Sequence, residues 1–78
     1  MSKIKYVIVN SMPIVFSEGN KHTDFANRET AEGAGFFQVK YNTETHRFEV
    51  HVFGESVSLG IKSDPDDAYY IEKLFNDY

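Results

Sequence analysis

The chain contains no cysteine among its 78 residues. Disulfides, thiolate zinc sites and cysteine nucleophiles are therefore excluded. A chain this short buries only roughly 60% of the surface that its unfolded form exposes, and small domains often gain stability from a disulfide, a metal or a partner chain. With disulfides excluded, we expect association with a partner or with itself as a homo-oligomer. The lack of cysteine also fits a reducing cytoplasm.

Long apolar runs and basic clusters are missing as well. No apolar run approaches the ~20 residues needed to cross a membrane, and the stretch after Met1–Lys5 is too short and interrupted for a signal peptide. The net charge is −4, and residues 54–78 hold six acidic side chains against two lysines. Phosphate binding needs a clustered basic surface. We therefore expect a cytoplasmic protein without membrane or direct nucleic-acid binding, although an acidic nucleic-acid mimic stays open.

Motifs for catalysis and cofactor binding are the third absence. Residues 54–58 read Gly-Glu-Ser-Val-Ser and lack the G-x-S-x-G frame of a nucleophile elbow. Residues 33–35 form only a G-x-G that no crossover helix follows, so no phosphate-binding loop is predicted. His22 and Asp24 supply two potential ligands, which do not hold a metal. We expect no cofactor, no metal and no enzymatic activity, with an enzyme of unrecognised type as the remaining alternative.

What the chain does have is strand-like alternation. Five short segments alternate between apolar and polar residues or are rich in β-branched residues, which is typical of strands: residues 3–9, 13–16, 36–41, 46–53 and 56–61. Asn10-Ser11 and residues 42–45 predict turns that join the first and second pairs into hairpins. Pro13 cannot donate a ladder hydrogen bond, so its segment starts a strand or lies at an edge. In the last segment Val57, Leu59 and Ile61 are expected to point inward.

A helix is predicted from residue 65 to the chain end. Ser63 or Asp64 caps it, Pro65 suits its first position, and the following aspartates favour the positive end of its dipole. Its apolar face consists of Ala68, Ile71, Leu74 and Phe75. The prediction is therefore one α+β domain over residues 1–78: a single antiparallel sheet of about five short strands with the C-terminal helix packed on one face.

The polar stretch Ser17–Gly33 interrupts this pattern, and a loop that long in so small a domain is usually functional or disordered. A short helical turn is expected within residues 22–29. If the loop folds over the sheet, it brings three of its side chains to the break after the fourth strand and forms a polar pocket: His22, Asp24 and Arg28 with Glu55, Ser56 and Ser58. Arg28 would then hold a phosphate or carboxylate. The alternative is that these groups are solvated or tie the loop to the sheet.

Several aromatic residues fall on the predicted outer face of the sheet or on the helix: Tyr6, Phe36, Phe53, Tyr69 and Tyr70. Aromatic side chains are enriched at protein interfaces. They are equally consistent with a second, smaller core under the long loop. Both interpretations stay open at the level of the sequence.

Short segments spread over most of the chain resemble small uncharacterised proteins encoded by bacteriophages and prophages: Tyr6-Val7-Ile8-Val9-Asn10, Pro13-Ile14-Val15-Phe16-Ser17, Ala34-Gly35-Phe36, Gly54-Glu55-Ser56-Val57-Ser58-Leu59 and Ser63-Asp64-Pro65-Asp66-Asp67. The resemblance transfers no activity and no catalytic residue. It implies a context, because small phage proteins often inhibit or modify host machinery, including defence systems.

Together with this resemblance, these observations predict a phage-derived, non-enzymatic binding protein that inhibits or modifies a bacterial host protein or complex, such as a defence protein, by steric binding. The long loop, exposed strand edges and the acidic C-terminal helix would provide the contacts. One alternative is a protein that sequesters a nucleotide or another anionic small molecule in the loop-covered pocket or at a subunit interface. The acidic nucleic-acid mimic is the second alternative.

Overall fold

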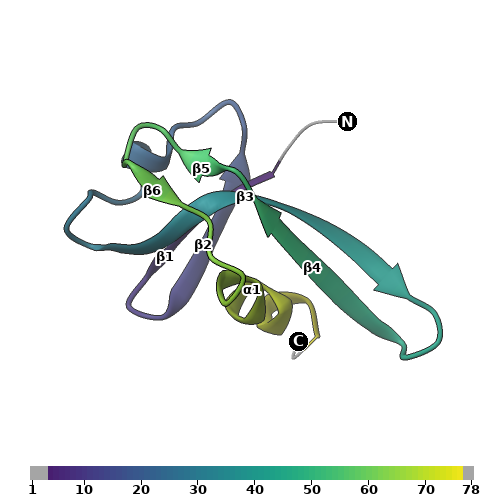
Figure 1. Cartoon of the computed structure of the whole chain (residues 1–78). Helices are drawn as coiled ribbons and strands as arrows, with labels where there is room; N and C mark the ends of the chain where they lie inside the picture. The colour runs from purple at the N-terminus through teal and green to yellow at the C-terminus, as the bar shows by residue number, and fades with distance from the viewer. Residues whose placement is uncertain (1–3, 77–78) are drawn as a thin grey trace.

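A four-stranded antiparallel sheet in the order β2-β1-β3-β4 forms the centre of the computed structural model, which describes residues 4–76 (Figure 1). The elements follow the chain as β1 (Ile4–Val9), β2 (Met12–Ser17), the 3₁₀ turn η1 (His22–Asp24), β3 (Ala31–Asn42), β4 (Arg47–Phe53), β5 (Glu55–Ser56), β6 (Ile61–Lys62) and α1 (Asp67–Asn76). The α+β class and the C-terminal helix are confirmed. The predicted strand start at Lys3 and the helix end at residue 78 lie outside the described residues.

The single five-stranded sheet is a correction: the main sheet has four strands, and β5 and β6 pair separately. Residues 56–61 are not one strand, because Leu59 N–H donates to Ser56 Oγ (3.2 Å) and Gly60 N–H to Ser56 O (2.8 Å). These bonds close a turn, and Gly60 provides its positive φ of 69°. The predicted inward position of Val57 is wrong, since its side chain is 86% exposed.

The predicted loop from Ser17 to Gly33 is shorter than expected, because β3 begins at Ala31 and its first residues pair with β1. Small residues are needed at the start of β3, because atoms from later in the chain lie against its main chain. A Cβ on Gly33 would lie 2.6 Å from Asp67 Oδ1, at the start of the helix. The small residues 33–35 are therefore a covered stretch of strand.

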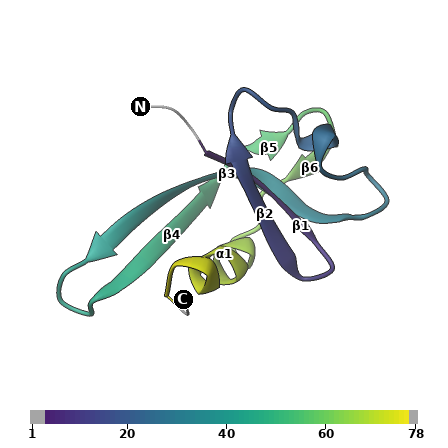
Figure 2. The ribbon, with the colours of Figure 1, turned by 180° about the vertical axis from the view of Figure 1, so that it is seen from behind.

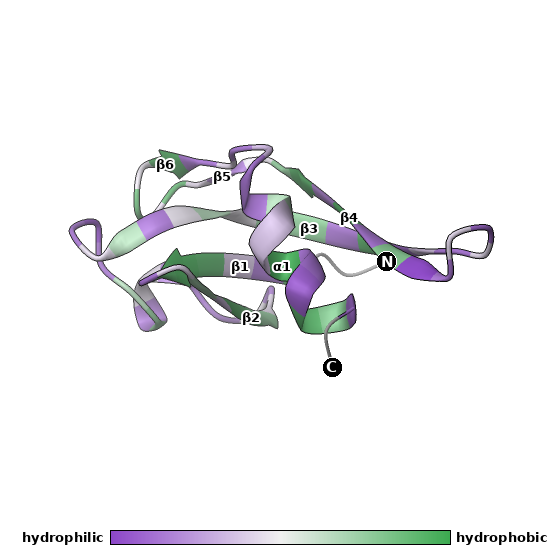
Figure 3. Ribbon diagram, turned by 90° about the horizontal axis from the view of Figure 1, so that it is seen from below, coloured by the Kyte–Doolittle hydropathy of each residue, from purple (hydrophilic) through white to green (hydrophobic). Residues whose placement is uncertain are grey.

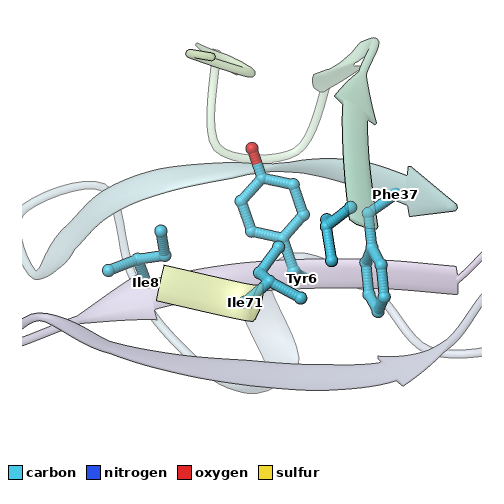
Figure 4. Packing of buried hydrophobic residues seen from close by; sticks show 5 residues of the cluster. Tyr6, Ile8, Phe37 and Ile71 are labelled. Carbon is cyan, nitrogen blue, oxygen red and sulfur yellow. The ribbon is translucent and has the colours of Figure 1, made fainter. Parts of the chain in front are cut away.

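The helix packs on one face of the sheet and closes the larger core. Tyr6, Ile8, Phe37 and Ile71 are almost completely buried between the two layers (Figure 4). Tyr6, expected on the outer face, thus lies in the core instead. Its hydroxyl donates to Asp67 Oδ2 (2.6 Å), which also accepts the Asp64 N–H (3.0 Å). Burial raises the pKa of Tyr6 well above its usual value, and the adjacent Asp67 carboxylate adds to the rise.

A second, smaller core lies on the opposite face of the sheet. Val7, Phe16, Ala34 and Leu59 are buried there, beneath the β2–β3 loop and the β5–β6 segment. A core does lie under the loop, but none of the five aromatic residues predicted for it belongs to this cluster, and Tyr6 and Tyr70 pack in the helix-side core instead. Figures 1 and 2 show η1 beside β5 and β6, with the β3–β4 hairpin projecting away from the rest of the molecule.

The two edges of the main sheet differ. At β4, the Asn76 amide of α1 accepts the Phe48 N–H (2.8 Å) and donates to Phe48 O (2.9 Å). Glu72 Oε1 accepts the Val50 N–H (3.2 Å). The helix thus covers the β4 edge, whereas no strand of residues 4–76 lies beyond β2, the outermost strand in Figure 3. None of the helices described is long and apolar enough to span a membrane.

Candidate functional site

His22 anchors the β2–β3 loop to the sheet. Its imidazole is 3% exposed, and Nε2 lies 2.9 Å from Gly35 O, which requires the proton on that nitrogen. The rings of Phe16 and Phe36 meet it edge-on, with centroid distances of 5.3 and 5.9 Å. Burial lowers the pKa of His22, and the Lys5 charge acts in the same direction against the Gly35 hydrogen bond. His22 is therefore a neutral, structural side chain at physiological pH.

Three other candidates form contacts within the loop and the β5–β6 turn. Arg28 Nε donates to Leu59 O (3.1 Å), which ties the loop to the turn. Asp24 Oδ2 accepts the Lys21 N–H (2.9 Å) at the start of η1. Ser56 is buried and its Oγ accepts the Leu59 N–H. The loop does fold over the sheet, held by the Arg28 bond to the turn and the His22 bond to β3, while Asp24 and Ser56 stabilise their own segments.

The loop and the turn enclose an open pocket of about 350 Å³ on this face of the sheet. Its lining residues are Lys5, Lys21, His22, Phe36, Glu55, Val57 and Ser58. Three of the six candidates thus line the pocket, namely His22, Glu55 and Ser58. The volume lies near the lower end of the ~300–1,000 Å³ typical of ligand pockets. A binding role for the six candidates stays a prediction.

Sequence reasoning missed Lys5, Lys21, Phe36 and Val57 as pocket residues. Lys5 and Phe36 had a usable signal, because both lie on the strand faces opposite the helix-side core. They face each other directly in the β1–β3 register. The Lys5 ammonium lies 5.8 Å from the Phe36 ring centroid and donates to Asn20 O (2.8 Å). No local pattern indicated that the turn would carry Val57 to the pocket rim.

The chemistry of the pocket favours binding. It combines two ammonium groups, one carboxylate, one hydroxyl and an aromatic ring, a mixture that accommodates an acidic or mixed polar group. The one side-chain partner of Ser58 Oγ in the described structure is Ser56 Oγ, at 3.4 Å. Within residues 4–76, no group of three or more His, Asp or Glu side chains is placed to hold a metal ion.

Comparisons with protein-family models, curated proteins and solved structures found no match to the chain. No residue role is therefore transferred from a relative. The resemblance to phage-encoded proteins remains an expectation from the sequence.

Proposed function

We propose that the chain is a non-enzymatic binding protein that contacts a partner protein through the pocket face, defined as the seven pocket-lining residues and the β2–β3 loop, which carries two of them. The observation that supports this is a contrast in burial: the base of the face, beneath the loop, is held by buried contacts, whereas its rim exposes an apolar side chain to solvent. His22 and Arg28 hold the base by buried or half-buried hydrogen bonds, while Val57 stands 86% exposed beside the pocket.

An apolar side chain at the tip of a firmly held turn is suited to act as an anchor in an interface. Interface cores are depleted in charge and rich in apolar contacts, and a few well-placed side chains carry most of the binding energy. Because the loop is already ordered by its contacts, binding costs little loop entropy. The lysines at positions 5 and 21 favour a partner that presents a carboxylate next to an apolar patch.

The proposed partner is a bacterial host protein or complex, and the proposed mechanism is steric occlusion of its working surface. The small size of the chain and its resemblance to phage-encoded proteins support this choice. A 9.0-kDa protein with a preformed contact face can cover a partner surface without supplying chemistry of its own.

Affinity capture from bacterial lysate with matched variants tests the proposal. Val57→Asp and Lys21→Glu should each abolish capture of the partner that the wild-type chain enriches. Thr43→Asp, at the exposed tip of the distant β3–β4 hairpin, is the control and should retain it. Equal capture by all four proteins would exclude the pocket face as the contact surface.

The second candidate function is sequestration of a nucleotide or another anionic small molecule. Lys5, Lys21 and the Phe36 ring in one pocket favour it, because cations pair with phosphate and aromatic rings stack on bases. Native mass spectra of the untagged protein would then show a low-mass adduct that Lys21→Ala removes. Protein masses without an adduct would exclude a retained ligand and leave the protein-binding proposal.

A further inference from the structure

The β1–β2 hairpin determines which main-chain groups of β2 face outward. Asn10 and Ser11 form a two-residue loop with φ values of 53° and 61°, and Val9 pairs with Met12. In such a loop the flanking residues form a hydrogen-bonded pair, and pairs then alternate along the ladder. Ile14 and Phe16 therefore bond to β1. Residues 13, 15 and 17 direct their main-chain groups to the free edge.

The three residues on this edge differ in the main-chain hydrogen-bond donors and acceptors that they offer. Val15 offers both an N–H and a C=O. Pro13 offers only its C=O, because proline has no N–H. Ser17 offers its N–H, while its C=O accepts the Asn20 N–H at 3.1 Å within the same chain. The edge thus lacks a donor at one end and has an occupied acceptor at the other.

The donors and acceptors on this edge match those of the same edge in a second copy of the chain. When two β2 strands pair antiparallel about a two-fold axis at Val15, the two Val15 residues exchange N–H···O bonds in both directions. Pro13 then lies opposite Ser17 of the second copy and accepts its N–H. The missing Pro13 N–H falls opposite the Ser17 C=O, which Asn20 already satisfies. Four hydrogen bonds form, and no donor at residues 13, 15 or 17 is left without a partner.

The side chains of the edge are also suited to burial. Residues 12–17 carry no charge, although exposed edge strands are commonly protected by lysine or glutamate. Val15 is 40% exposed on the helix side of the sheet, and Ile4, its diagonal neighbour on β1, is 41% exposed. On the other face Phe25 is 41% exposed and lies with its ring centroid 4.3 Å from that of Phe16. A second copy would cover apolar surface on both faces.

We propose that the free edge of β2 binds a second copy of this chain, which joins two four-stranded sheets into one continuous eight-stranded sheet with two-fold symmetry. The β4 edges are covered by α1, so assembly stops at the dimer. The axis runs perpendicular to the sheet and places both pocket faces on the same side. The dimer would therefore present two copies of the proposed contact face, although it does not depend on that function.

The oligomeric state is measured first, by sedimentation equilibrium or light scattering of the purified chain at about 100 μM. We expect a mass twice the 9.0-kDa chain mass. Val15→Lys places two like charges at the axis and should give the monomer mass, whereas Thr43→Lys adds the same charge at the distant hairpin tip and should leave the dimer intact. A wild-type monomer at this concentration, or assemblies larger than two chains, would overturn the proposal.

The register is measured independently by disulfide formation, which is clean because the chain has no native cysteine. Residues opposite each other in a hydrogen-bonded pair have Cα atoms about 5.5 Å apart, within the range that a disulfide spans. Val15→Cys should therefore form a covalent dimer under mild oxidation. Met12→Cys, which is more exposed, should not, because its two copies would lie about 20 Å apart at ~3.3 Å per residue. Equal cross-linking of both variants would reject the two-fold pairing at Val15, even if Val15→Lys unfolds.

Discussion

At the scale of single residues, the Tyr6 hydroxyl is the polar contact that joins the first strand to the start of the helix. It donates to Asp67 Oδ2 at 2.6 Å, in a site where both side chains are nearly or fully buried. The same oxygen accepts the Asp64 N–H, so one carboxylate organises the helix entry and receives the core tyrosine. A buried charge is tolerated only when it is hydrogen-bonded in this way.

Replacement of Tyr6 by phenylalanine should lower the free energy of unfolding by about 1.5–3 kcal/mol, the range for a hydrogen bond to a charged group. Urea denaturation of both proteins at pH 7 measures the difference. Tyr41→Phe is the matched control, because the Tyr41 side chain is 46% exposed and its hydroxyl contact with His46 is 3.5 Å long. Equal losses of stability in the two variants would mean that the Tyr6 hydrogen bond stabilises the fold no more than the long Tyr41 contact does.

The raised pKa of Tyr6 also predicts a loss of stability at high pH. The unfolded chain releases the phenolic proton near the usual pKa of 10.0, while the folded chain retains it. The stabilising contribution is therefore complete below pH 10 and decreases as the pH rises further. Stability measured between pH 9 and 11 should fall more steeply for the wild type than for Tyr6→Phe. Parallel pH profiles would contradict the burial of the phenol.

His22 predicts the opposite dependence at mildly acidic pH. Its pKa is lowered in the folded state, so the unfolded chain binds the proton first as the pH falls below 6.5. Its stabilising contribution is complete above that value and is lost progressively below it. Between pH 7.5 and 5.5, His22→Gln should therefore lose less stability than the wild type. A His22→Gln profile identical to that of the wild type would show that this imidazole titrates freely.

At the scale of elements, the helix stabilises the sheet in two ways. Ile71 packs into the core, and polar side chains of the helix bond to main-chain groups on the β4 edge. The Asn76 amide bonds to both main-chain groups of Phe48, as a neighbouring strand would. This protection matters because an open edge can pair with other chains.

Asn76→Ala should remove both bonds to Phe48 and cost about 1–3 kcal/mol of stability, since each hydrogen bond contributes a net ~0.5–1.5 kcal/mol. The Phe48 amide should also exchange with solvent much faster, because its acceptor has gone. Hydrogen exchange followed by NMR measures both effects. Gln38→Thr, an exposed change on β3, should leave the Phe48 rate unaltered. An unchanged Phe48 rate in Asn76→Ala would refute the edge-cap role.

The sequence predicted the hairpins and the helix because their signals are local. Asn10-Ser11 forms the expected tight turn, and Val39 faces inward as its alternation indicates. The segment 56–61 was wrongly predicted as a strand, since its alternating pattern also fits a turn whose shape depends on Gly60 and on Ser56 Oγ. The entry to β3 was missed because small residues resemble loop residues until the helix that covers them is placed.

At the scale of the whole molecule, the sheet separates two cores, one under the helix and one under the loop and the β5–β6 segment. The sequence left open whether the loop and residues 55–58 would meet in a pocket or whether their side chains would tie the loop down, and the structure contains elements of both. It did not show that the Arg28 and Ser56 side chains would both hydrogen-bond to the main chain of Leu59. Leu59 reaches these two side chains only when the β5–β6 turn has folded. The pocket lysine on β1 was likewise hidden until the loop position was known.

The central claim is that the pocket face contacts a partner protein, and site-specific photo-crosslinking in bacterial cells tests it most directly. A benzophenone amino acid replaces Val57 in one protein and Thr43 in another, and both are irradiated in living cells. We expect one discrete adduct of defined mass from position 57 and none from position 43. No adduct at position 57, or the same diffuse background from both positions, would contradict the claim.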